Sequence, residues 1–404
     1  VLFFALPIIF MPFSKALTSI STALLLLFAL FIFYKNSKIK DLFKIEYLLL
    51  FAYFILSLVS VFYSTNTTNA WSKILLKLPL FFLPFLVLVK RKQELPWFLH
   101  FELVMVSMTS FIGLLSIMNY FNHKEDLDFM VLQNKPIPVI ADIYHIEFSV
   151  ILALSIIISI YRLLYFYWRG STSQYIYGLC AFIGLVAIHI MAVRTGLLSL
   201  YIGIFVLLVF YIIKTKKYKL LILSSVGAFM LLGFMYSTSE SFQNRILLTI
   251  EDINVLQTNK DRNWHSVSMR FEAFENGVKL FKKYPLTGVG IGDVNIEMQK
   301  EYIANDTKLQ EVNRKKPHHQ FLENALQSGI LSPLLLLAIL LVPLFYKKYR
   351  SPLIIAFVFS VLAAMQFESI LERQSTVVAF TLLFAHLLST NDAAYNFYKK
   401  KSST

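Results

Sequence analysis

Residues 196–213 read GLLSLYIGIFVLLVFYII, a run without a single charged side chain. A helix of roughly 20 apolar residues is long enough to cross the hydrocarbon core of a bilayer, which is about 30 Å thick. A transmembrane β-strand would instead alternate in polarity over about 10 residues, and this run does not. Residues 196–213 therefore predict a membrane-spanning α-helix.

Similar apolar runs recur along the chain and predict about twelve transmembrane helices. They cover residues 1–13, 16–34, 45–63, 72–89, 97–121, 146–168, 174–193, 196–213, 219–237, 320–346, 351–368 and 373–389. Of the 404 residues, 57% are hydrophobic and 15% are charged, whereas an average soluble domain has roughly 25% charged residues. Because lipid must cover most of such a surface, the predicted fold class is an all-α integral membrane protein.

The first apolar run, from Val1 to Phe13, is short for a span, and we interpret it as the remainder of a longer one. No basic segment or small-residue cleavage site accompanies it, so the pattern does not predict a cleavable signal peptide. Cys180 is the only cysteine. A disulfide within the chain and a thiolate metal site are therefore both excluded.

Basic residues gather in alternate loops and predict which side of the membrane each loop faces, since cytoplasmic loops retain Lys and Arg. The basic residues are Lys35, Lys38, Lys40, Lys44, Lys90, Arg91, Lys92, Arg169, Lys214, Lys216, Lys217, Lys219, Lys347, Lys348 and Arg350, with Lys399, Lys400 and Lys401 in the tail. Both termini are predicted to be cytoplasmic. The net charge of +14 is then a topology signal, and no nucleic-acid partner is expected.

The predicted organisation has four parts. These are a bundle of about nine transmembrane helices at 1–237, a loop at 238–319, C-terminal transmembrane helices at 320–390 and a basic cytoplasmic tail at 391–404. The loop faces the outside on this topology, which is the periplasm in a bacterium with an outer membrane. Loops of this length are usually functional or disordered. Ser268–Tyr284 predicts a helix closed by Pro285, so we expect short helices in this loop.

Two arginines on the predicted external side are candidate binding residues, and the charge rule disfavours the position of Arg194 in particular. Arg194 occupies a short turn between two spans, and Thr195 is expected to cap the helix that follows. Anions bind at helix N-termini, so Arg194 beside these amides would give a bidentate clamp for phosphate. Arg270 shares one face of the predicted helix with Phe274 and Phe281. The alternative for both arginines is a side chain that snorkels along an interface.

Residues 314–319, RKKPHH, precede another apolar run. Pro317 suits the first turn of a helix, which would place His318 at a positive helix end beside three basic side chains. Both effects favour neutral imidazole, the form that accepts a proton. A polar interfacial histidine without chemistry is the alternative. The adjacent His318 and His319 also suggest a metal, but no further ligand lies at a suitable spacing, so no metal is predicted.

Three segments together resemble the signature of the O-antigen ligase family. They are RTGLL at 194–198, Arg270 followed by YPLTGVGIG at 284–292, and PHHQFL at 317–322 with Gly329 and Ile330. The resemblance covers order and spacing from about residue 190 to 335. It implies that His318 is the essential histidine and that Arg194 and Arg270 are the essential arginines.

Two further segments bear on that resemblance. His319 stands where the family usually has Asn, which leaves open which of the two histidines acts. Residues 367–374, FESILERQ, resemble a segment seen in some members. Glu368, Glu372 and Arg373 would lie in the last external turn and are candidate supporting residues, with a simple ion pair as the alternative.

Proteins of this family, the resemblance implies, transfer a glycan from an undecaprenyl diphosphate carrier to an acceptor hydroxyl, with lipid A-core expected, at the outer face of the inner membrane. No cofactor is expected, because two arginines can stabilise the leaving diphosphate and His318 has a suitable intrinsic pKa for a base. A polymerase of the same superfamily is one alternative. A transporter or flippase is another, for which inverted repeats and ionisable residues at mid-membrane would be expected.

Overall fold

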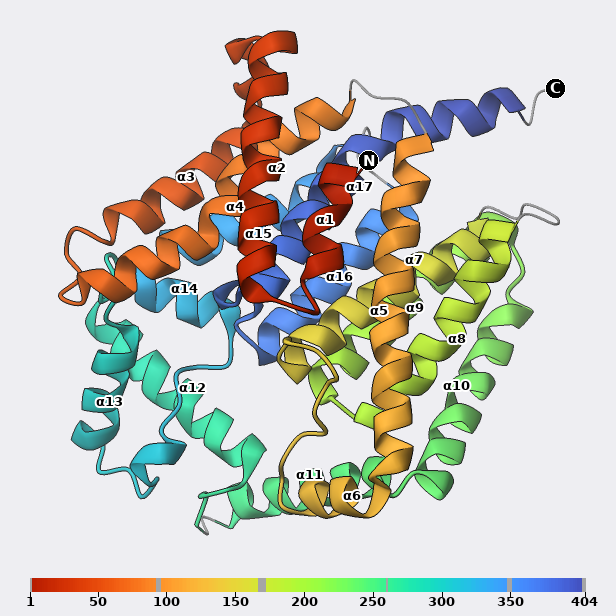
Figure 1. Ribbon diagram of the computed structural model, residues 1–404. Helices are drawn as coiled ribbons and strands as arrows, with labels where there is room; N and C mark the ends of the chain where they lie inside the picture. The colour runs from red at the N-terminus through yellow and green to blue at the C-terminus, as the bar shows by residue number, and fades with distance from the viewer. Residues whose placement is uncertain (1, 92–95, 166–171, 259–260, 347–350, 402–404) are drawn as a thin grey trace.

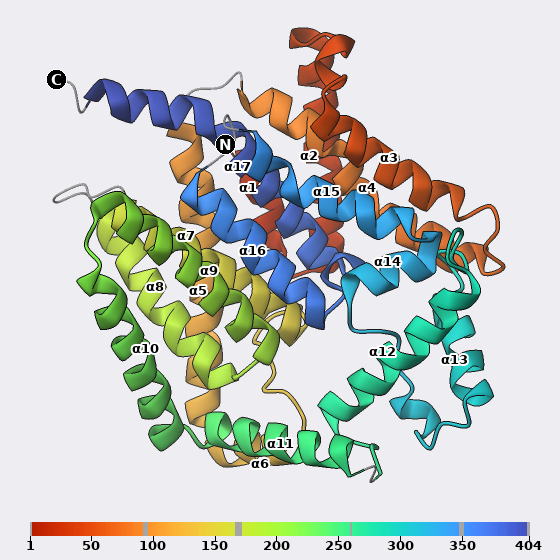
Figure 2. The ribbon, with the colours of Figure 1, turned by 180° about the vertical axis from the view of Figure 1, so that it is seen from behind.

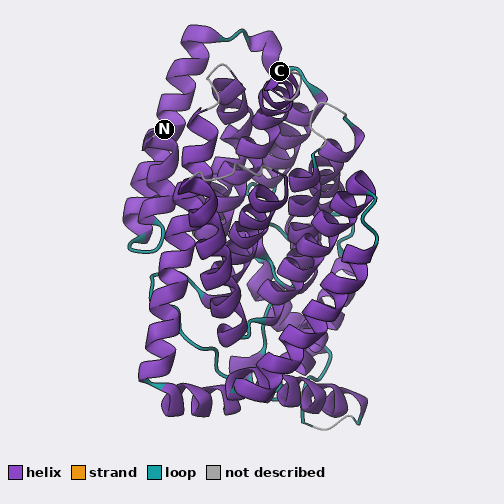
Figure 3. Cartoon of the chain, turned by 90° about the vertical axis from the view of Figure 1, so that its right-hand side faces the viewer, coloured by secondary structure: helices purple, strands orange, loops and turns teal. Residues whose placement is uncertain are grey.

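The computed structural model of the protein describes residues 2–91, 96–165, 172–258, 261–346 and 351–401. Within these ranges all regular structure is helical, and none of it is strand (Figure 3). The predicted all-α class is confirmed. The basic residues Lys92, Arg169, Lys347, Lys348 and Arg350, and the end of the predicted span 146–168, lie outside these ranges.

In the part of the chain that the structure describes, ten α-helices precede the long segment that follows residue 238. They are α1 (Leu2–Phe10), α2 (Lys15–Asn36), α3 (Ile45–Val59), α4 (Thr67–Arg91), α5 (Pro96–Asn122), α6 (Lys124–Leu132), α7 (His145–Tyr165), α8 (Thr172–Met191), α9 (Arg194–Thr215) and α10 (Lys219–Thr238), with a 3-10 turn η1 at Ile39–Leu42. Of the described helices, α2, α4, α5, α7, α8 and α9 are long and apolar enough to cross a membrane. The chain is therefore a multi-pass membrane protein, and the number twelve stays a prediction.

Among the described residues, helices also occupy much of 238–319, and four further α-helices follow. They are α11 (Glu240–Gln257), α12 (Ser266–Lys283), α13 (Val294–Ala304), η2 (Glu311–Asn313), α14 (Gln320–Ser328), α15 (Leu331–Phe345), α16 (Pro352–Phe367), η4 (Ile370–Glu372) and α17 (Gln374–Lys401). The predicted helix Ser268–Tyr284 is confirmed as α12. Helices α12, α13 and α14 share a small apolar core that includes Leu280, Met298 and Leu326.

The predicted span 320–346 is wrong, because the chain breaks there into α14 and α15. Gly329 at the break has φ of +78°, and a Cβ atom at this position would lie 1.8 Å from the carbonyl oxygen of Leu286. Around it the Val289 N–H donates to the Leu326 carbonyl at 2.7 Å, and the Ile330 N–H donates to the Pro285 carbonyl at 2.9 Å. The glycine-rich segment 284–292 is thus seated against the helix break.

Helix α9 packs between α7 and α16 near the centre of the molecule. The hydroxyls of Ser199 on α9 and Ser360 on α16 lie 2.6 Å apart, and both residues are buried. Small side chains of this kind let transmembrane helices approach each other closely. Helices α6 and α11 lie side by side across one end of the bundle, opposite the connection between α2 and α3 (Figure 1). The view from behind shows α12 leading from α11 toward α14 (Figure 2).

Candidate active site

A cavity of about 740 Å³ lies where the ends of several helices meet. The turn between α8 and α9 contributes Arg194, α12 contributes Arg270, and the segment before α14 contributes His318 and His319. Arg194, Arg270 and His318, which are far apart along the chain, therefore line one cavity, whereas residues 284–292 do not. Phe367, at the end of α16, also lines it.

His318 is paired with a carboxylate. Its Nδ1 atom lies 3.1 Å from both carboxylate oxygens of Glu368. An ionised carboxylate can only accept hydrogen bonds, so Nδ1 carries a proton, and in the neutral ring Nε2 has the lone pair. Among the described residues none hydrogen-bonds to Nε2. His318 is therefore held in the tautomer that can take a proton from a group in the cavity.

The carboxyl group of Glu368 is ionised at neutral pH. Burial alone would raise its pKa, but the hydrogen bond and the charge of His318, followed by the positive charges of Arg270 and Arg373, lower that pKa to about 2. The Nη2 atom of Arg270 lies 3.4 Å from Oε2 of Glu368. Glu368 is thus a negative charge shared between the histidine and one of the two predicted arginines.

Arg270 is anchored at the end of α16. Its Nη1 atom donates to the carbonyl oxygen of Phe367 at 2.6 Å, in addition to the contact with Glu368. The predicted face of α12 therefore does direct Arg270 toward the cavity, while Phe274 from the next turn of the helix lines the same wall. A guanidinium held at two points loses less rotamer entropy when it binds an anion.

Arg194 begins α9 beyond a tight turn in which Ala192 has φ of +48°. The predicted cap by Thr195 is wrong, because Val193 is the N-cap residue and Thr195 is already inside the helix and buried. The Nη1 atom of Arg194 lies 3.7 Å from Oδ2 of Asp252 on α11. Its Nε and Nη2 atoms are buried and make no hydrogen bond within the described chain. Buried unsatisfied donors are costly, so they favour an anion here.

Asp252 was not expected from the sequence. This fully buried carboxylate accepts from the backbone N–H of Val267 at 2.9 Å and lies 3.0 Å from Nδ1 of His265. These contacts join α11 to the start of α12. Asp252 therefore fixes the helix that carries Arg270 while it also neutralises part of the charge of Arg194.

His319 has a different environment from that of His318. It is the N-cap of α14, and its Nδ1 atom accepts the N–H of Leu322 at 3.1 Å. Its Nε2 atom then carries the proton and lies 3.0 Å from Oε1 of Gln366. Burial lowers the pKa of His319, so the ring is neutral and both nitrogens are engaged. The expectation that Pro317 and His318 form the first turn of the helix is wrong, because α14 begins at Gln320.

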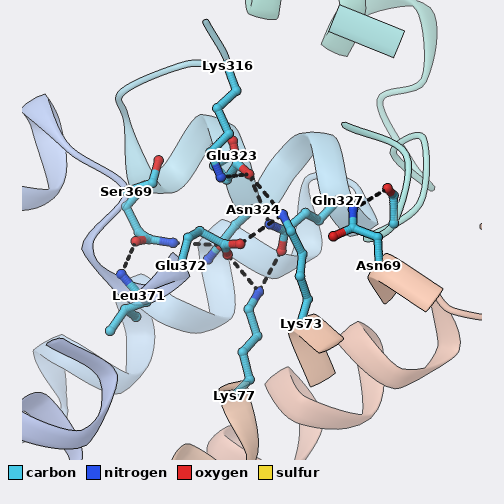
Figure 4. Close-up of polar contacts among 12 residues, drawn as sticks. Asn69, Lys73, Lys77, Lys316, Glu323, Asn324, Gln327, Ser369, Leu371 and Glu372 are labelled. Atoms are coloured by element: carbon cyan, nitrogen blue, oxygen red, sulfur yellow. Dashed lines mark hydrogen bonds and ion pairs between the residues drawn. The ribbon is translucent and has the colours of Figure 1, made fainter. Parts of the chain in front are cut away.

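Glu372 and Arg373 do not line the cavity. Glu372 lies 3.0 Å from the amine of Lys73 and 3.2 Å from that of Lys77 on α4 (Figure 4). Although burial raises the pKa of Glu372, these two charges bring it below its usual value. The guanidinium of Arg373 lies 4.3 Å from the ring centroid of Tyr144 and 3.7 Å from Glu147, which places Arg373 behind the cavity wall.

The buried polar cluster in Figure 4 holds the segment that carries Glu368. Glu323 on α14 lies 3.3 Å from Lys73 and 3.2 Å from Lys316. The backbone N–H of Leu371 donates to Oε1 of Gln320 at 2.7 Å, and the Ser369 hydroxyl donates to the carbonyl oxygen of Pro317 at 3.1 Å. The segments on either side of the His318–Glu368 pair are therefore tied together directly.

The cavity also contains side chains that sequence reasoning missed. Arg245 on α11, Tyr144 directly before α7 and His145 at the start of α7 line it. Arg245 lies in the predicted external loop, so the same charge rule that singled out Arg194 could have indicated it. Among the described residues no group of three or more His, Cys, Asp or Glu side chains is arranged to hold a metal ion.

Comparison with known proteins agrees with the sequence resemblance. A family model described as O-antigen ligase matches residues 179–337, which confirms that resemblance. The matched range includes Arg194, Arg270 and His318 and ends before Glu368. A search of curated proteins finds no match to this chain.

Proposed function

Since residues 179–337 carry an O-antigen ligase family domain, we propose that this membrane protein is an inverting glycosyltransferase of the ligase type. The donor is a glycan linked to undecaprenyl diphosphate, and the acceptor is a sugar hydroxyl of lipid A-core. The reaction takes place at the periplasmic face of the inner membrane. The observation that carries this proposal is that His318, which lines the cavity with Arg194 and Arg270, is paired with the carboxylate of Glu368.

The arginines suit the leaving group. When the bond between the anomeric carbon and the diphosphate oxygen breaks, negative charge grows on that oxygen. Fixed donors directed at developing charge usually supply the largest part of an enzyme's rate enhancement. Arg194 has two buried donor atoms without a hydrogen-bond partner in the described chain, and Arg270 is fixed to the end of α16. Both guanidinium groups can thus bind the diphosphate, and the proposed mechanism proceeds without a metal ion.

The histidine suits the acceptor. A sugar hydroxyl is a weak nucleophile until a base removes its proton. In the proposed step the acceptor oxygen attacks the anomeric carbon of the donor sugar while Nε2 of His318 takes the hydroxyl proton. The new glycosidic bond forms as the bond to the diphosphate breaks, and the carrier diphosphate leaves with the bonding electrons. Direct attack from the opposite face inverts the anomeric centre.

Glu368 completes the base. Its carboxylate accepts a hydrogen bond from the Nδ1–H group of His318. It therefore orients the ring and stabilises the imidazolium that forms when Nε2 is protonated. The low pKa of Glu368 keeps this partner charged through the reaction. His319 takes no part in the proton transfer, because both of its ring nitrogens already have partners.

The proposal is tested with the purified protein, a carrier-linked glycan and lipid A-core. Formation of glycan joined to lipid A-core supports the ligase. A lengthened glycan that remains on the carrier would identify a polymerase of the same superfamily instead. Movement of labelled carrier lipid across the proteoliposome membrane without any new glycosidic bond would identify a flippase. It would contradict both the ligase and the polymerase.

A further inference from the structure

A third guanidinium group reaches the cavity from α11. Arg245 lines the cavity together with Arg194 and Arg270, and its Nη2 atom donates to the carbonyl oxygen of Lys135 in the segment between α6 and α7. The positive charge of Arg270 interacts with that of Arg194, and the charge of Arg194 interacts with that of Arg245. The three side chains therefore bring their positive charges to one cavity.

These three arginines carry more positive charge than the neighbouring carboxylates neutralise. The described residues that line the cavity include three arginines and no carboxylate. Glu368 is shared between Arg270 and His318, and Asp252 is shared between Arg194 and the start of α12. Burial and the nearby charge of Arg194 lower the pKa of Arg245 to about 10. Clustered, poorly neutralised guanidinium groups favour a ligand with several negative charges.

We propose that Arg245 is a third phosphate-binding residue and that it makes the cavity selective for a diphosphate carrier over a monophosphate carrier. This inference rests on the proposed function, since it concerns the donor of the same reaction. A monophosphate is small enough to be satisfied by Arg194 and Arg270. A diphosphate has a second phosphate group with further oxygens and charge, and Arg245 provides a third guanidinium group in the same cavity to bind it.

A purely structural role for Arg245 makes a different prediction. If Arg245 serves only to hold Lys135 through its carbonyl oxygen, its loss will loosen the cavity wall and weaken the two lipids equally. The substitution Arg245→Gln separates these cases, because the Gln amide keeps a donor for the Lys135 carbonyl but removes the charge. Arg245→Lys keeps the charge but loses the planar fork. Arg262→Ala is the matched control, since Arg262 is paired with Glu272 and does not line the cavity.

The experiment measures binding of undecaprenyl diphosphate and undecaprenyl monophosphate to the full-length protein in detergent. A charge-assisted hydrogen-bonding contact supports an affinity loss of about 10- to 100-fold for the diphosphate in Arg245→Gln. The monophosphate should change by less than about threefold, Arg245→Lys should be intermediate, and Arg262→Ala should bind both lipids normally. Equal loss for both lipids, or unchanged diphosphate binding, would overturn the inference.

Failure of this inference is distinguishable from failure of the proposed function. If the wild-type protein transfers glycan and Arg245→Gln binds the diphosphate normally, only the role of Arg245 is wrong. If the wild-type protein transfers no glycan to any acceptor, the proposed function is wrong. Should Arg245→Gln not fold, Arg245→Lys carries the test, because a preference for diphosphate identical to that of the wild type would overturn the role of the guanidinium fork.

Discussion

Replacement of Glu368 by Gln tests the histidine–carboxylate pair with little change in shape. The amide oxygen of Gln can still accept a hydrogen bond from the Nδ1–H group of His318, so the ring keeps its orientation. The negative charge 3.1 Å from Nδ1 is lost, and with it the stabilisation of the imidazolium formed during proton transfer. Two charges about 4 Å apart interact by about 4 kcal/mol at the effective dielectric of a protein surface. We expect a large part of this energy, about 3 kcal/mol, to be added to the activation free energy of transfer. Such an increase lowers kcat by ~10²-fold.

The assay is steady-state transfer by the purified protein, with the donor affinity measured separately. Donor binding should change little in Glu368→Gln, because Arg270 keeps its hydrogen bond to the Phe367 carbonyl. The exposed Glu311→Gln is the control for loss of one negative charge. In the double variant with His318→Ala, kcat should fall no further than in His318→Ala alone, since Glu368 acts through His318. Normal kcat in Glu368→Gln, or additive losses in the double variant, would refute the pairing.

Three other predictions follow from the same geometry. His319→Asn should retain transfer activity and stability, because the Asn side chain can cap α14 by accepting the Leu322 N–H; a dead but folded variant would contradict this. Gly329→Ala should lower the thermal unfolding temperature in detergent, since its Cβ would lie 1.8 Å from a carbonyl oxygen at a positive φ, whereas Gly178→Ala, which meets nothing within 4 Å, should not. The pKa of Glu368 falls from 4.5 to about 2 on folding, so its contribution to stability is present above about pH 4.5 and is lost as the pH falls toward 2. Unfolding temperatures of Glu368→Gln should show a shallower acid dependence, and equal slopes would contradict the assignment.

Much of the transmembrane bundle is predictable from the sequence because continuous apolar runs encode long helices locally. Residues 196–213, for example, lie within α9. The break between α14 and α15 is not predictable in this way. It depends on the contact of Gly329 with Leu286, which is a long-range effect, and α14 is a nine-residue helix whose polar residues are buried against α4 and η4.

The candidate site also has a part that the sequence predicts and a part that depends on tertiary contacts. Motif order indicated Arg194, Arg270 and His318, and the structure gathers all three around one cavity. Which partner each residue has was not encoded locally. Glu368 meets His318, whereas Glu372, four residues later, faces the lysines of α4. The separate environments of His318 and His319 likewise depend on contacts with the end of α16.

The most direct test of the central claim is a comparison of His318→Ala with the wild type in transfer and in donor binding. Both are measured with purified protein, a carrier-linked glycan donor and lipid A-core. Loss of a general base typically costs about 10²- to 10⁴-fold in rate, so transfer by His318→Ala should fall by that factor while donor affinity stays near the wild-type value. Transfer by His318→Ala at the wild-type rate would contradict the proposed mechanism.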